Sequence, residues 1–392
     1  MKKVAVIGAG ITGLLASYYL CRKGHRVTVF EEQRYPAMKT SFANGGQLSV
    51  SNSETWTTYG NVTRGIRWMF KPDAPLLIRP NFDIDKIKWL FGFLKNTIMN
   101  THYQNTIDSI NLGLESRKLY KEIVSEENIS FDQSDCGILH FYKDYEYFDK
   151  AKKSKSLYDD ADAGTEWEII SAERVLDIEP TLKNAEGIVG GVWTPNDSVG
   201  DIHKFCNNLA IVLKEKYNVE FFFDTTINHI PSLNHYDAVV VSNGVGSTAL
   251  AKTINENLGI YPVKGYSITI HAEDIRSYNA LPKVSLLDDQ AKIVTSTLGN
   301  RLRVAGTAEL AGENYDIRRD RIEPLLDWVH NNLPNVDTRN YHSWACLRPM
   351  TPNMMPIVEQ SKVNSKVFYH CGHGHLGWTY SPATAKQLAD MI

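Results

Sequence analysis

The first part of the chain carries the feature that most constrains its fold, a glycine-rich turn between two apolar strands. Residues 2–32 read "KKVAVIGAGITGLLASYYLCRKGHRVTVFEE", with the spacing Gly8-x-Gly10-x-x-Gly13 directly after the first apolar run. At this spacing the first glycine permits a tight turn, the second lets the backbone approach a pyrophosphate, and the third lets a helix pack on the strand. The N–H groups that open the helix then face the phosphates. The segment therefore predicts a strand–helix–strand unit that binds a dinucleotide.

The residues after the turn support this unit and narrow the choice of nucleotide. Apolar side chains between Leu14 and Tyr19 recur at helical spacing, Gly24 ends the helix, and "RVTVF" alternates as a second strand. Glu31 ends that strand, where a carboxylate accepts hydrogen bonds from ribose hydroxyls and disfavours a 2′-phosphate. We therefore expect NAD or FAD rather than NADP. The predicted contacts are Gly8, Ala9, Gly10, Ile11, Thr12, Gly13, Glu31 and Glu32.

Composition bounds the remaining classes of function. The chain has 392 residues and a net charge of −3, which argues against an extended nucleic-acid surface. Its five cysteines are odd in number and widely spaced, as expected in a reducing compartment without a disulfide framework or a metal-binding pair. No apolar run reaches the ~18 residues of a membrane span. Lys2 and Lys3 imitate the start of a signal peptide, but the glycine spacing explains the apolar run that follows, so we expect an uncleaved cytoplasmic enzyme.

A polar loop follows the second strand and separates the two candidate nucleotides. Residues 39–50, which we call the polar loop, read "KTSFANGGQLSV". In many FAD enzymes the chain returns after the second strand to cover the isoalloxazine ring, and small residues let it run close to the ring. An ordinary polar surface loop is the alternative interpretation. On the FAD interpretation we expect contacts from Ser41, Asn44, Gly45, Gly46, Gln47 and Leu48.

The polar loop resembles the S-x-A-N-x-G-Q segment of D-amino-acid dehydrogenases within the glycine/D-amino-acid oxidase (DAO) family. Later segments are similar to blocks of the same family in the same order: "PVKGYSITI" (262–270), "KIVTSTLGNRLRVAGTAEL" (292–310), "LRPMTPNMMPIV" (347–358) and "CGHGHLGWT" (371–379). The resemblance covers residues 1–392 and implies an FAD-dependent oxidoreductase.

The resemblance also implies an α/β fold, with a Rossmann-like FAD-binding domain and an α+β substrate-binding domain built on a mixed sheet. Each domain is expected from separate stretches of chain: 1–50, 186–262 and 341–392 for FAD, and 51–185 and 263–340 for the substrate. Periodicity predicts helices over 84–100, 106–124 and 146–163 and a strand over 137–143. A buried strand that runs into Asn243 and Gly244 is expected to meet the cofactor.

An amino-acid substrate needs its carboxylate held and its α-hydrogen directed at the flavin. Arginine is the preferred bidentate partner of a carboxylate, and Arg348 matches the family's carboxylate-binding arginine. Tyr266 is expected to donate a second hydroxyl to the carboxylate or to line the pocket, and a packed sheet tyrosine is the alternative. Lys292 lies near the place of a lysine that helps the flavin react with oxygen in the sarcosine-oxidase branch. The dehydrogenases also tend to have a lysine here, so Lys292 does not separate the two activities, and a strand-end surface lysine is the alternative. No general base stands out, and none is required if the amine binds neutral and gives hydride directly to flavin N5.

Three departures from the family pattern concern the flavin site. His375 replaces the threonine of G-H-G-T-L-G-W-T, and Pro382 follows among small residues. Cys346 stands two residues before Arg348, where the sarcosine-oxidase branch links its flavin covalently through sulfur. We expect non-covalent FAD, with a covalent link at Cys346 as the alternative. The further predicted contacts are Ile227, Asn243, Gly244, Cys346, Gly372, His373, Gly374, His375, Leu376 and Gly377. In residues 372–377 we expect the backbone and a helix N-terminus to contact the flavin, and we do not expect the histidines to act as acid or base.

The resulting hypothesis is oxidative deamination of a D-amino acid to a 2-oxo acid and ammonia. The flavin would pass the electrons to a quinone or to another acceptor that is not oxygen. An oxygen-using amine oxidase of the glycine or sarcosine type, and a non-catalytic flavin-binding subunit of a complex, are the alternatives. Residues 67–80 and 86–94 mix Trp, Phe and Leu with Lys or Arg. We expect them either to touch the inner face of the cell membrane, as interfacial segments do, or to form buried helices. The sequence predicts no oligomeric state.

Overall fold

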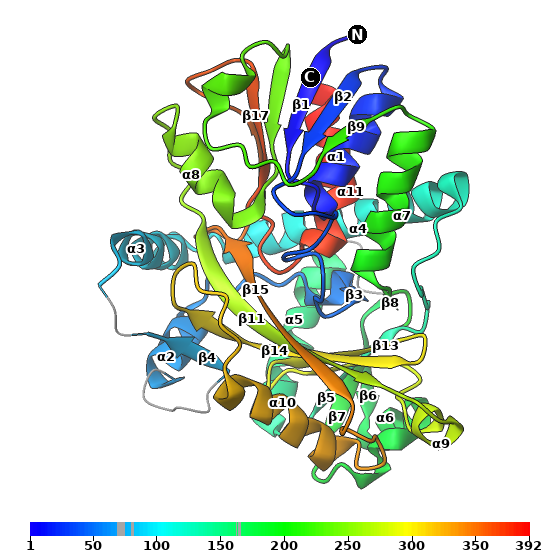
Figure 1. Ribbon diagram of the computed structural model, residues 1–392. Coiled ribbons are helices and arrows are strands. Elements are labelled where there is room, and N and C mark those ends of the chain that lie inside the picture. Colours follow the sequence, from blue (N-terminus) through cyan, green and yellow to red (C-terminus); the bar gives the residue numbers. More distant parts are fainter. Residues whose placement is uncertain (69–74, 80–81, 162, 164–165) are drawn as a thin grey trace.

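Two β-sheets organise the molecule in the computed structural model, which describes residues 1–68, 75–79, 82–161, 163 and 166–392 (Figure 1). The first sheet is mainly parallel and contains the N-terminal unit, and the second sheet is mixed and lies below it in Figure 1. The two chain ends meet at the top of the first sheet, where the Lys2 Nζ donates to the Ile392 carbonyl at 2.6 Å. The predicted α/β fold with a Rossmann-like domain is confirmed.

The first sheet has the strand order β16–β17–β10–β1–β2–β9. β16 runs antiparallel to β17, and the other neighbours are parallel. The "AVVV" and "VAVI" runs of the central strands are at most 4% exposed, as expected for parallel strands that are covered on both faces. The strands are β16 (Ile357–Gln360), β17 (Val367–Cys371), β10 (Ala238–Val241), β1 (Lys3–Ile7), β2 (Arg26–Phe30) and β9 (Glu220–Phe222).

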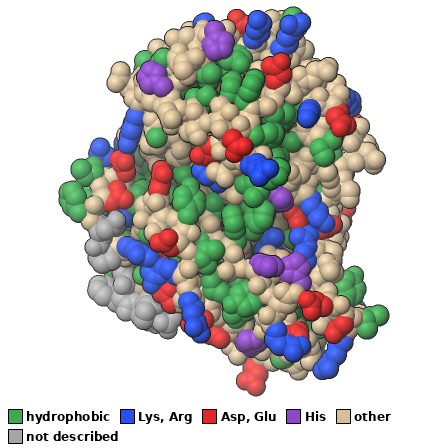
Figure 2. All heavy atoms as spheres, viewed as in Figure 1, with side chains coloured by type: hydrophobic (Ala, Val, Ile, Leu, Met, Phe, Trp, Pro, Cys, Tyr) green, Lys and Arg blue, Asp and Glu red, His purple; other side chains and the backbone are tan. Residues whose placement is uncertain are grey.

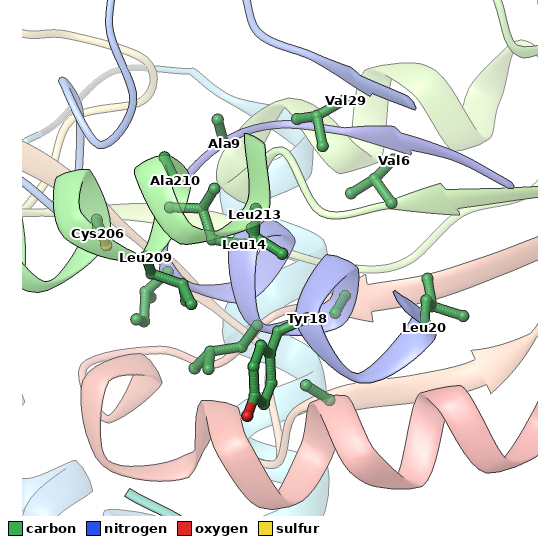
Figure 3. Packing of buried hydrophobic residues seen from close by; sticks show 14 of the residues in the cluster. Val6, Ala9, Leu14, Tyr18, Leu20, Val29, Cys206, Leu209, Ala210 and Leu213 are labelled. Atoms are coloured by element: carbon green, nitrogen blue, oxygen red, sulfur yellow. The ribbon is translucent and has the colours of Figure 1, made fainter. Parts of the chain in front are cut away.

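Helices pack on both faces of this sheet. On one face, Leu14 and Tyr18 of α1 fill the space between Val6 and Val29 of the strands and Leu213 of α7 (Figure 3). Each fully buried leucine contributes about 1.5–3 kcal/mol to folding, so this apolar layer fixes the helix that follows the glycine turn. The other face packs against α8. The helices are α1 (Ile11–Arg22), α7 (Ile202–Glu215), α11 (Gly377–Met391), α4 (His102–Glu127) and α8 (Ser247–Lys252).

α11 tolerates a proline because a neighbouring helix replaces the missing hydrogen bond. Pro382 lacks the N–H that would bond to the Trp378 carbonyl four residues earlier. The Tyr120 hydroxyl of α4 donates to that carbonyl at 2.6 Å. The next amide, that of Ala383, donates to the Ser116 hydroxyl of α4 at 3.1 Å. Pro382 therefore fits a continuous helix that begins at the cavity described below.

The second sheet has the order β15–β11–β14–β13–β12–β5–β7–β6, and β4 pairs with β14. α10 covers the face that is turned away from the first sheet (Figure 1). A short pair, β3 (Gln47–Leu48) and β8 (Ser198–Val199), lies between the two sheets. The strands are β15 (Tyr341–Met350), β11 (Tyr261–His271), β14 (Arg301–Leu310), β13 (Ile293–Leu298), β12 (Ser285–Asp288), β5 (Ile138–Tyr142), β7 (Gly190–Thr194), β6 (Glu168–Ser171) and β4 (Leu76–Ile78).

The remaining helices surround this sheet. Three predicted helices and one predicted strand lie close to elements of the structure. Helices are found at 84–98, 102–127 and 145–160, and the predicted strand is found at 138–142. No helix in the described part of the chain is long and apolar enough to cross a membrane. The helices are α2 (Tyr59–Trp68), α3 (Ile84–Ile98), α5 (Tyr145–Asp160), α6 (Ala172–Ile178), α9 (Ile275–Asn279) and α10 (Arg319–Asn332).

Two strands lie in the second sheet although the predicted ranges place them in the FAD-binding domain. β7 pairs with β5 and β6, although residues 186–262 were expected in the FAD-binding domain. β15 pairs with β11 along its whole length, although residues 341–392 were expected there as well. β7 and β15 belong to the second sheet because the strands that they pair with are strands of that sheet. Arg348 therefore reaches the cavity from the second sheet.

Candidate functional site

A single cavity of about 860 Å³ runs from the glycine turn to the face of the second sheet. At one end it is lined by residues at the carboxyl ends of the parallel strands, including Ile7, Phe30 and Cys371. Ligands of open α/β sheets bind at this edge. At the other end it is lined by β11, β13, β14 and β15. The cavity therefore joins a nucleotide-type site to a second chamber.

The glycine turn has the geometry that its spacing predicts. Gly8 has φ +102°, and a Cβ there would lie 2.7 Å from the Ser242 carbonyl oxygen. A Cβ at Gly13 would lie 1.9 Å from the Gly8 carbonyl oxygen, which only a glycine at the helix–strand contact avoids. A Cβ at Gly10 would meet the Ser41 hydroxyl at 3.4 Å. The turn is thus a close backbone cradle at the mouth of the first sheet.

Glu31 is buried beside this cradle. Its two carboxylate oxygens accept hydrogen bonds from the Ala9 N–H at 2.6 Å and the Gln33 N–H at 2.9 Å. Burial raises the pKa of Glu31, and these two N–H donors oppose that shift. Each oxygen keeps a second lone pair, and Glu31 lines the cavity. The neighbouring Glu32 is more exposed and pairs with Lys39.

The polar loop lines the middle of the cavity and is bonded to the start of α1 and to the second sheet. The Ser41 hydroxyl accepts the Ile11 N–H at 3.1 Å, at the start of α1. The Asn44 side-chain oxygen accepts the Gly46 N–H at 2.9 Å. The Gln47 amide donates to the Ser285 hydroxyl of β12 at 2.8 Å. The loop is therefore an ordered wall between the two chambers, and its contacts with a flavin stay a prediction.

Arg348 stands at the far end, on the face of the second sheet that looks into the cavity. Its Nη1 donates to the Thr307 carbonyl at 3.0 Å, and its guanidinium lies over Gly265 of the neighbouring strand. Burial lowers the pKa of Arg348 to about 10, so it remains charged at neutral pH. No carboxylate among the residues that the structure describes forms an ion pair with Arg348. A half-buried cation without such a partner is suited to an anionic ligand.

Tyr266 lies on the opposite face of the sheet. In a strand, successive side chains alternate between faces, and Gly265 and Ser267 face the cavity side. The Tyr266 ring is 2% exposed among the apolar residues under α10, and its hydroxyl donates to Glu309 at 2.6 Å. Tyr266 is nevertheless among the residues that line the cavity, and its hydroxyl is directed to Glu309. The predicted hydroxyl contact to the substrate carboxylate stays a prediction.

Lys292 and Cys346 also line the cavity. Lys292 has φ +56° at the start of β13, and its Nζ pairs with Asp289. The Cys346 sulfur lies 3.4 Å from the Thr40 hydroxyl. Burial raises the pKa of the Cys346 thiol, which keeps it in the unreactive protonated form.

The "GHGHLGWT" segment brings backbone and the N-terminus of α11 to the cavity. Gly372 and Gly374 have φ +71° and +59°, as residues with side chains rarely do. The His373 Nε2 lies 2.9 Å from the Thr384 hydroxyl inside α11. His375 stacks on Trp56, with 4.6 Å between ring centroids and 26° between ring planes. Burial lowers the pKa of His375 to about 3, so the ring is neutral at physiological pH.

Most of the predicted cofactor contacts line the cavity, and three do not. Ala9 is fully buried behind the turn, Gly13 packs on Gly8, and Leu48 pairs with Ser198. The predicted residues on the lining are Gly8, Gly10, Ile11, Thr12, Glu31, Glu32, Ser41, Asn44, Gly45, Gly46, Gln47, Ile227, Asn243, Gly244, Cys346, Gly372, His373, Gly374, His375, Leu376 and Gly377.

Sequence reasoning missed the apolar wall of the second chamber. Trp56 and side chains of α2 and α3 form it, including Val62, Ile66, Leu90 and Phe93. The helical periodicity of residues 84–98 was a signal for α3, but it did not indicate which face meets a ligand.

The residues of the cavity fit an FAD molecule. The close glycine cradle, the buried acid at the end of β2 and the helix N-terminus of α1 suit the adenosine and pyrophosphate parts of a dinucleotide. The cavity continues past the polar loop and ends at Arg348. A cofactor that fills both chambers would place its ring between the polar loop and the start of α11.

The comparisons with known proteins agree with this geometry. A family model described as FAD dependent oxidoreductase (DAO) matches residues 3–391. The chain is 43% identical over 408 residues to "D-amino acid dehydrogenase 3" of Mesorhizobium japonicum, covering 100% of this chain and 97% of that protein. It is 34% identical over 406 residues to a D-amino acid dehydrogenase of Rhizobium rhizogenes, covering 100% of this chain and 95% of that one.

A solved structure supports the fold. The glycine oxidase of Geobacillus kaustophilus superposes with a TM-score of 0.77 at 19% identity, covering 100% of this chain and 95% of that one. With the family model and the relatives covering the whole chain, the protein belongs to the DAO family of FAD-dependent oxidoreductases.

Proposed function

We propose that this protein oxidises a D-amino acid, using FAD, to an imino acid that water converts to a 2-oxo acid and ammonia. The names of the relatives at 43% and 34% identity support the substrate class and its chirality. The observation that carries the proposal is the guanidinium of Arg348, which is charged, half-buried and free of an ion-pair partner among the described residues.

Arg348 would bind the substrate carboxylate. The planar guanidinium donates a pair of parallel hydrogen bonds to a carboxylate, and such charge-assisted bonds are worth about 1.5–3 kcal/mol each. The Thr307 carbonyl fixes one edge of the guanidinium, and Gly265 leaves room beside it. The substrate side chain would then face the apolar wall of Trp56, Val62 and Phe93.

Bound FAD would supply the acceptor for the two electrons and the α-hydrogen. The residues that would hold it are the glycine cradle, Glu31, the polar loop and the N-terminus of α11. The protein's own contribution is then to bind and orient the substrate and to exclude water. His373 is buried and His375 is half-buried, and the loss of solvation lowers the pKa of each well below neutral. Neither is therefore assigned a proton-transfer step, and the amine would react in its neutral form.

We propose that the electron acceptor is a membrane quinone rather than oxygen. α3 supports this proposal because it exposes an apolar stripe. Ile84, Ile87, Phe91, Leu94 and Ile98 repeat at spacings of three and four residues and are 39–69% exposed. Figure 2 shows hydrophobic atoms gathered over α3 at the left edge of the molecule.

The surroundings of this stripe favour a bilayer with anionic lipids. Lys88 and Lys95 are exposed on the same helix beside the stripe, and basic residues add attraction to anionic lipid to the burial of apolar area. Leu90, Phe93 and the stripe residue Leu94 also line the cavity, so the stripe borders the cavity. A quinone in the membrane would therefore approach close to the flavin chamber. In the other expected segment, residues 67–80, positions 69–74 and 80 lie outside the described residues, and β4 (Leu76–Ile78) pairs with β14 in the second sheet.

The test is anaerobic reduction of the purified flavoprotein. D-amino acids should bleach the oxidised flavin band, and the matching L-amino acids, glycine and sarcosine should not. The reduced protein should recover quickly with a quinone analogue and slowly in air. Fast reoxidation of the flavin in air, with formation of hydrogen peroxide, would establish the oxidase alternative and give Lys292 a role in the reaction with oxygen. No bleaching by any amino acid would leave a flavin-binding subunit.

A further inference from the structure

The second sheet holds the polar loop by consecutive carbonyl oxygens. Three successive residues of the loop each direct the carbonyl to a buried side chain of a different strand. In chain order, the hydrogen bonds run from the Ser267 hydroxyl of β11 to the Ala43 oxygen (2.7 Å), from Arg303 Nη1 of β14 to the Asn44 oxygen (2.9 Å) and from the Ser296 hydroxyl of β13 to the Gly45 oxygen (2.7 Å). We call Ser267, Arg303 and Ser296 the carbonyl clamp.

The clamp residues are fixed before they meet the loop. Ser296 and Arg303 are paired residues of β13 and β14, and Thr269 of β11 pairs with Arg303 from the other side. Arg303 Nε donates to the Thr269 hydroxyl at 2.7 Å. Ser267, Ser296 and Arg303 are at most 5% exposed, so water does not compete for their hydrogen bonds.

The loop is pressed onto this face of the sheet. A Cβ at Gly45 would lie 2.7 Å from Val294 Cγ2 and would separate the loop from the sheet. Gly46 has φ +74° beside Ser296. The Gly-Gly pair of the sequence is therefore required by the contact with the second sheet, in addition to any contact with a cofactor.

The clamp also determines where the amide hydrogens of the loop point. In a trans peptide the N–H points away from the carbonyl of the same peptide unit, and the described chain has no cis peptide bond. The N–H groups of Asn44 and Gly45 are therefore directed away from the sheet. Both residues line the cavity, and neither N–H has a hydrogen-bond acceptor within the described part of the protein. Such amides call for an acceptor from a bound molecule.

We propose that Ser267, Arg303 and Ser296 are positioning residues that aim the Asn44 and Gly45 amides at the flavin ring and thereby raise its reduction potential. This inference rests on the proposed function in one respect, that FAD fills the cavity. Reduced flavin carries more negative charge than oxidised flavin, so fixed N–H donors favour the reduced state. The Arg303 charge, held behind the loop, acts in the same direction.

The test measures the potential of the holoenzyme directly. Ser267→Ala, Ser296→Ala, the double variant and Arg303→Lys are compared with the unaltered protein by anaerobic chemical reduction against a reference dye. We expect each serine variant to keep FAD and the double variant to lose about tenfold in the preference for reduced over oxidised FAD. For a two-electron couple that is a shift of about 30 mV to lower potential. Arg303→Lys keeps the charge and should shift the potential less than the double variant.

Thr295→Val is the matched control. Thr295 precedes Ser296 on β13, points to the opposite face, is 0% exposed, and its hydroxyl has no partner among the described residues. Its substitution should leave the potential unchanged. An unchanged potential in the double variant, an equal shift in Thr295→Val, or equal weakening of oxidised and reduced FAD would overturn the proposal. Because the reductant is chemical, a shifted potential in a protein that no amino acid reduces would sink the proposed function and leave the clamp standing.

Discussion

Replacing Gly265 by alanine separates the position of Arg348 from the stability of the fold. A Cβ at residue 265 would lie 2.4 Å from Arg348 Nη2 and 2.5 Å from its Cζ, against about 3.4 Å for an ordinary contact. The guanidinium must therefore move by about 1 Å. The atoms in conflict are at the free end of a long side chain, so the backbone need not shift and the fold should survive.

The expected cost falls on catalysis. A displacement of about 1 Å in a group that orients substrate costs on the order of 10²-fold in rate, which corresponds to about 2.7 kcal/mol of lost transition-state stabilisation. We therefore expect kcat/KM for a D-amino acid to fall about 100-fold in Gly265→Ala. FAD content and melting temperature should stay close to those of the unaltered protein. Steady-state assays with an artificial electron acceptor, a flavin spectrum and a thermal melt measure these quantities.

Gly60→Ala provides the matched control. A Cβ at Gly60 would meet its nearest atom at 4.0 Å, and Gly60 lies outside the cavity lining. Its kinetic constants should not change. Unaltered kcat/KM in Gly265→Ala would refute the assignment of Arg348 as the residue that binds the substrate carboxylate, since the alanine Cβ cannot coexist with the guanidinium in its present position.

Three other predictions follow from burial and exposure. Burial lowers the pKa of His140 to about 4, so between pH about 6.5 and 4 the unfolded chain binds more protons than the folded protein. The free energy of unfolding should therefore fall as the pH falls, by up to about 3 kcal/mol from this residue. Denaturant titrations should show a smaller loss of stability with falling pH in His140→Gln, and an identical pH dependence in the two proteins would disprove the assignment. Burial raises the pKa of the Cys346 thiol and keeps it protonated and unreactive, so denaturation should release FAD and leave the mass of the polypeptide unchanged. An added flavin mass that is absent from Cys346→Ser would establish the covalent alternative. Phe91→Glu should reduce co-sedimentation with anionic vesicles at least tenfold and leave turnover with a soluble acceptor intact. Lys152→Glu, at an exposed position of α5 away from the stripe, should change neither vesicle binding nor turnover. Vesicle binding by Phe91→Glu equal to that of the unaltered protein would remove α3 as the membrane contact.

The geometry of the glycine turn could be predicted from the sequence because local backbone rules decide much of it. The Gly8–Gly13 spacing requires close backbone contacts. Gly13 packs on Gly8 inside the same strand–helix unit, whereas Gly8 meets Ser242, which lies far along the chain. The small residues of the polar loop likewise indicated close packing. That packing proved to be against the second sheet, through contacts such as Ser296 to Gly45, which join residues far apart in the chain.

The substrate half was harder to predict because strand pairing decides it. Whether Tyr266 faces the cavity or the core depends on the register of β11 with its neighbours, and the sequence alternation does not show which face is which. β15 was expected beside the nucleotide domain because its neighbours along the chain belong there. The aromatic wall at Trp56 carries no motif, since any large apolar residue of suitable shape would serve.

The central claim is that Arg348 selects a free carboxylate, and one comparison tests it most directly. The rate of anaerobic flavin reduction would be measured with a D-amino acid and with the matching D-amino-acid amide, in the unaltered protein and in Arg348→Met. The account predicts that the unaltered protein reacts with the acid at least about 100-fold better than with the amide, and that Arg348→Met loses this preference while it keeps its FAD. A preference that survives in Arg348→Met would contradict the account, because the carboxylate would then be held by another group.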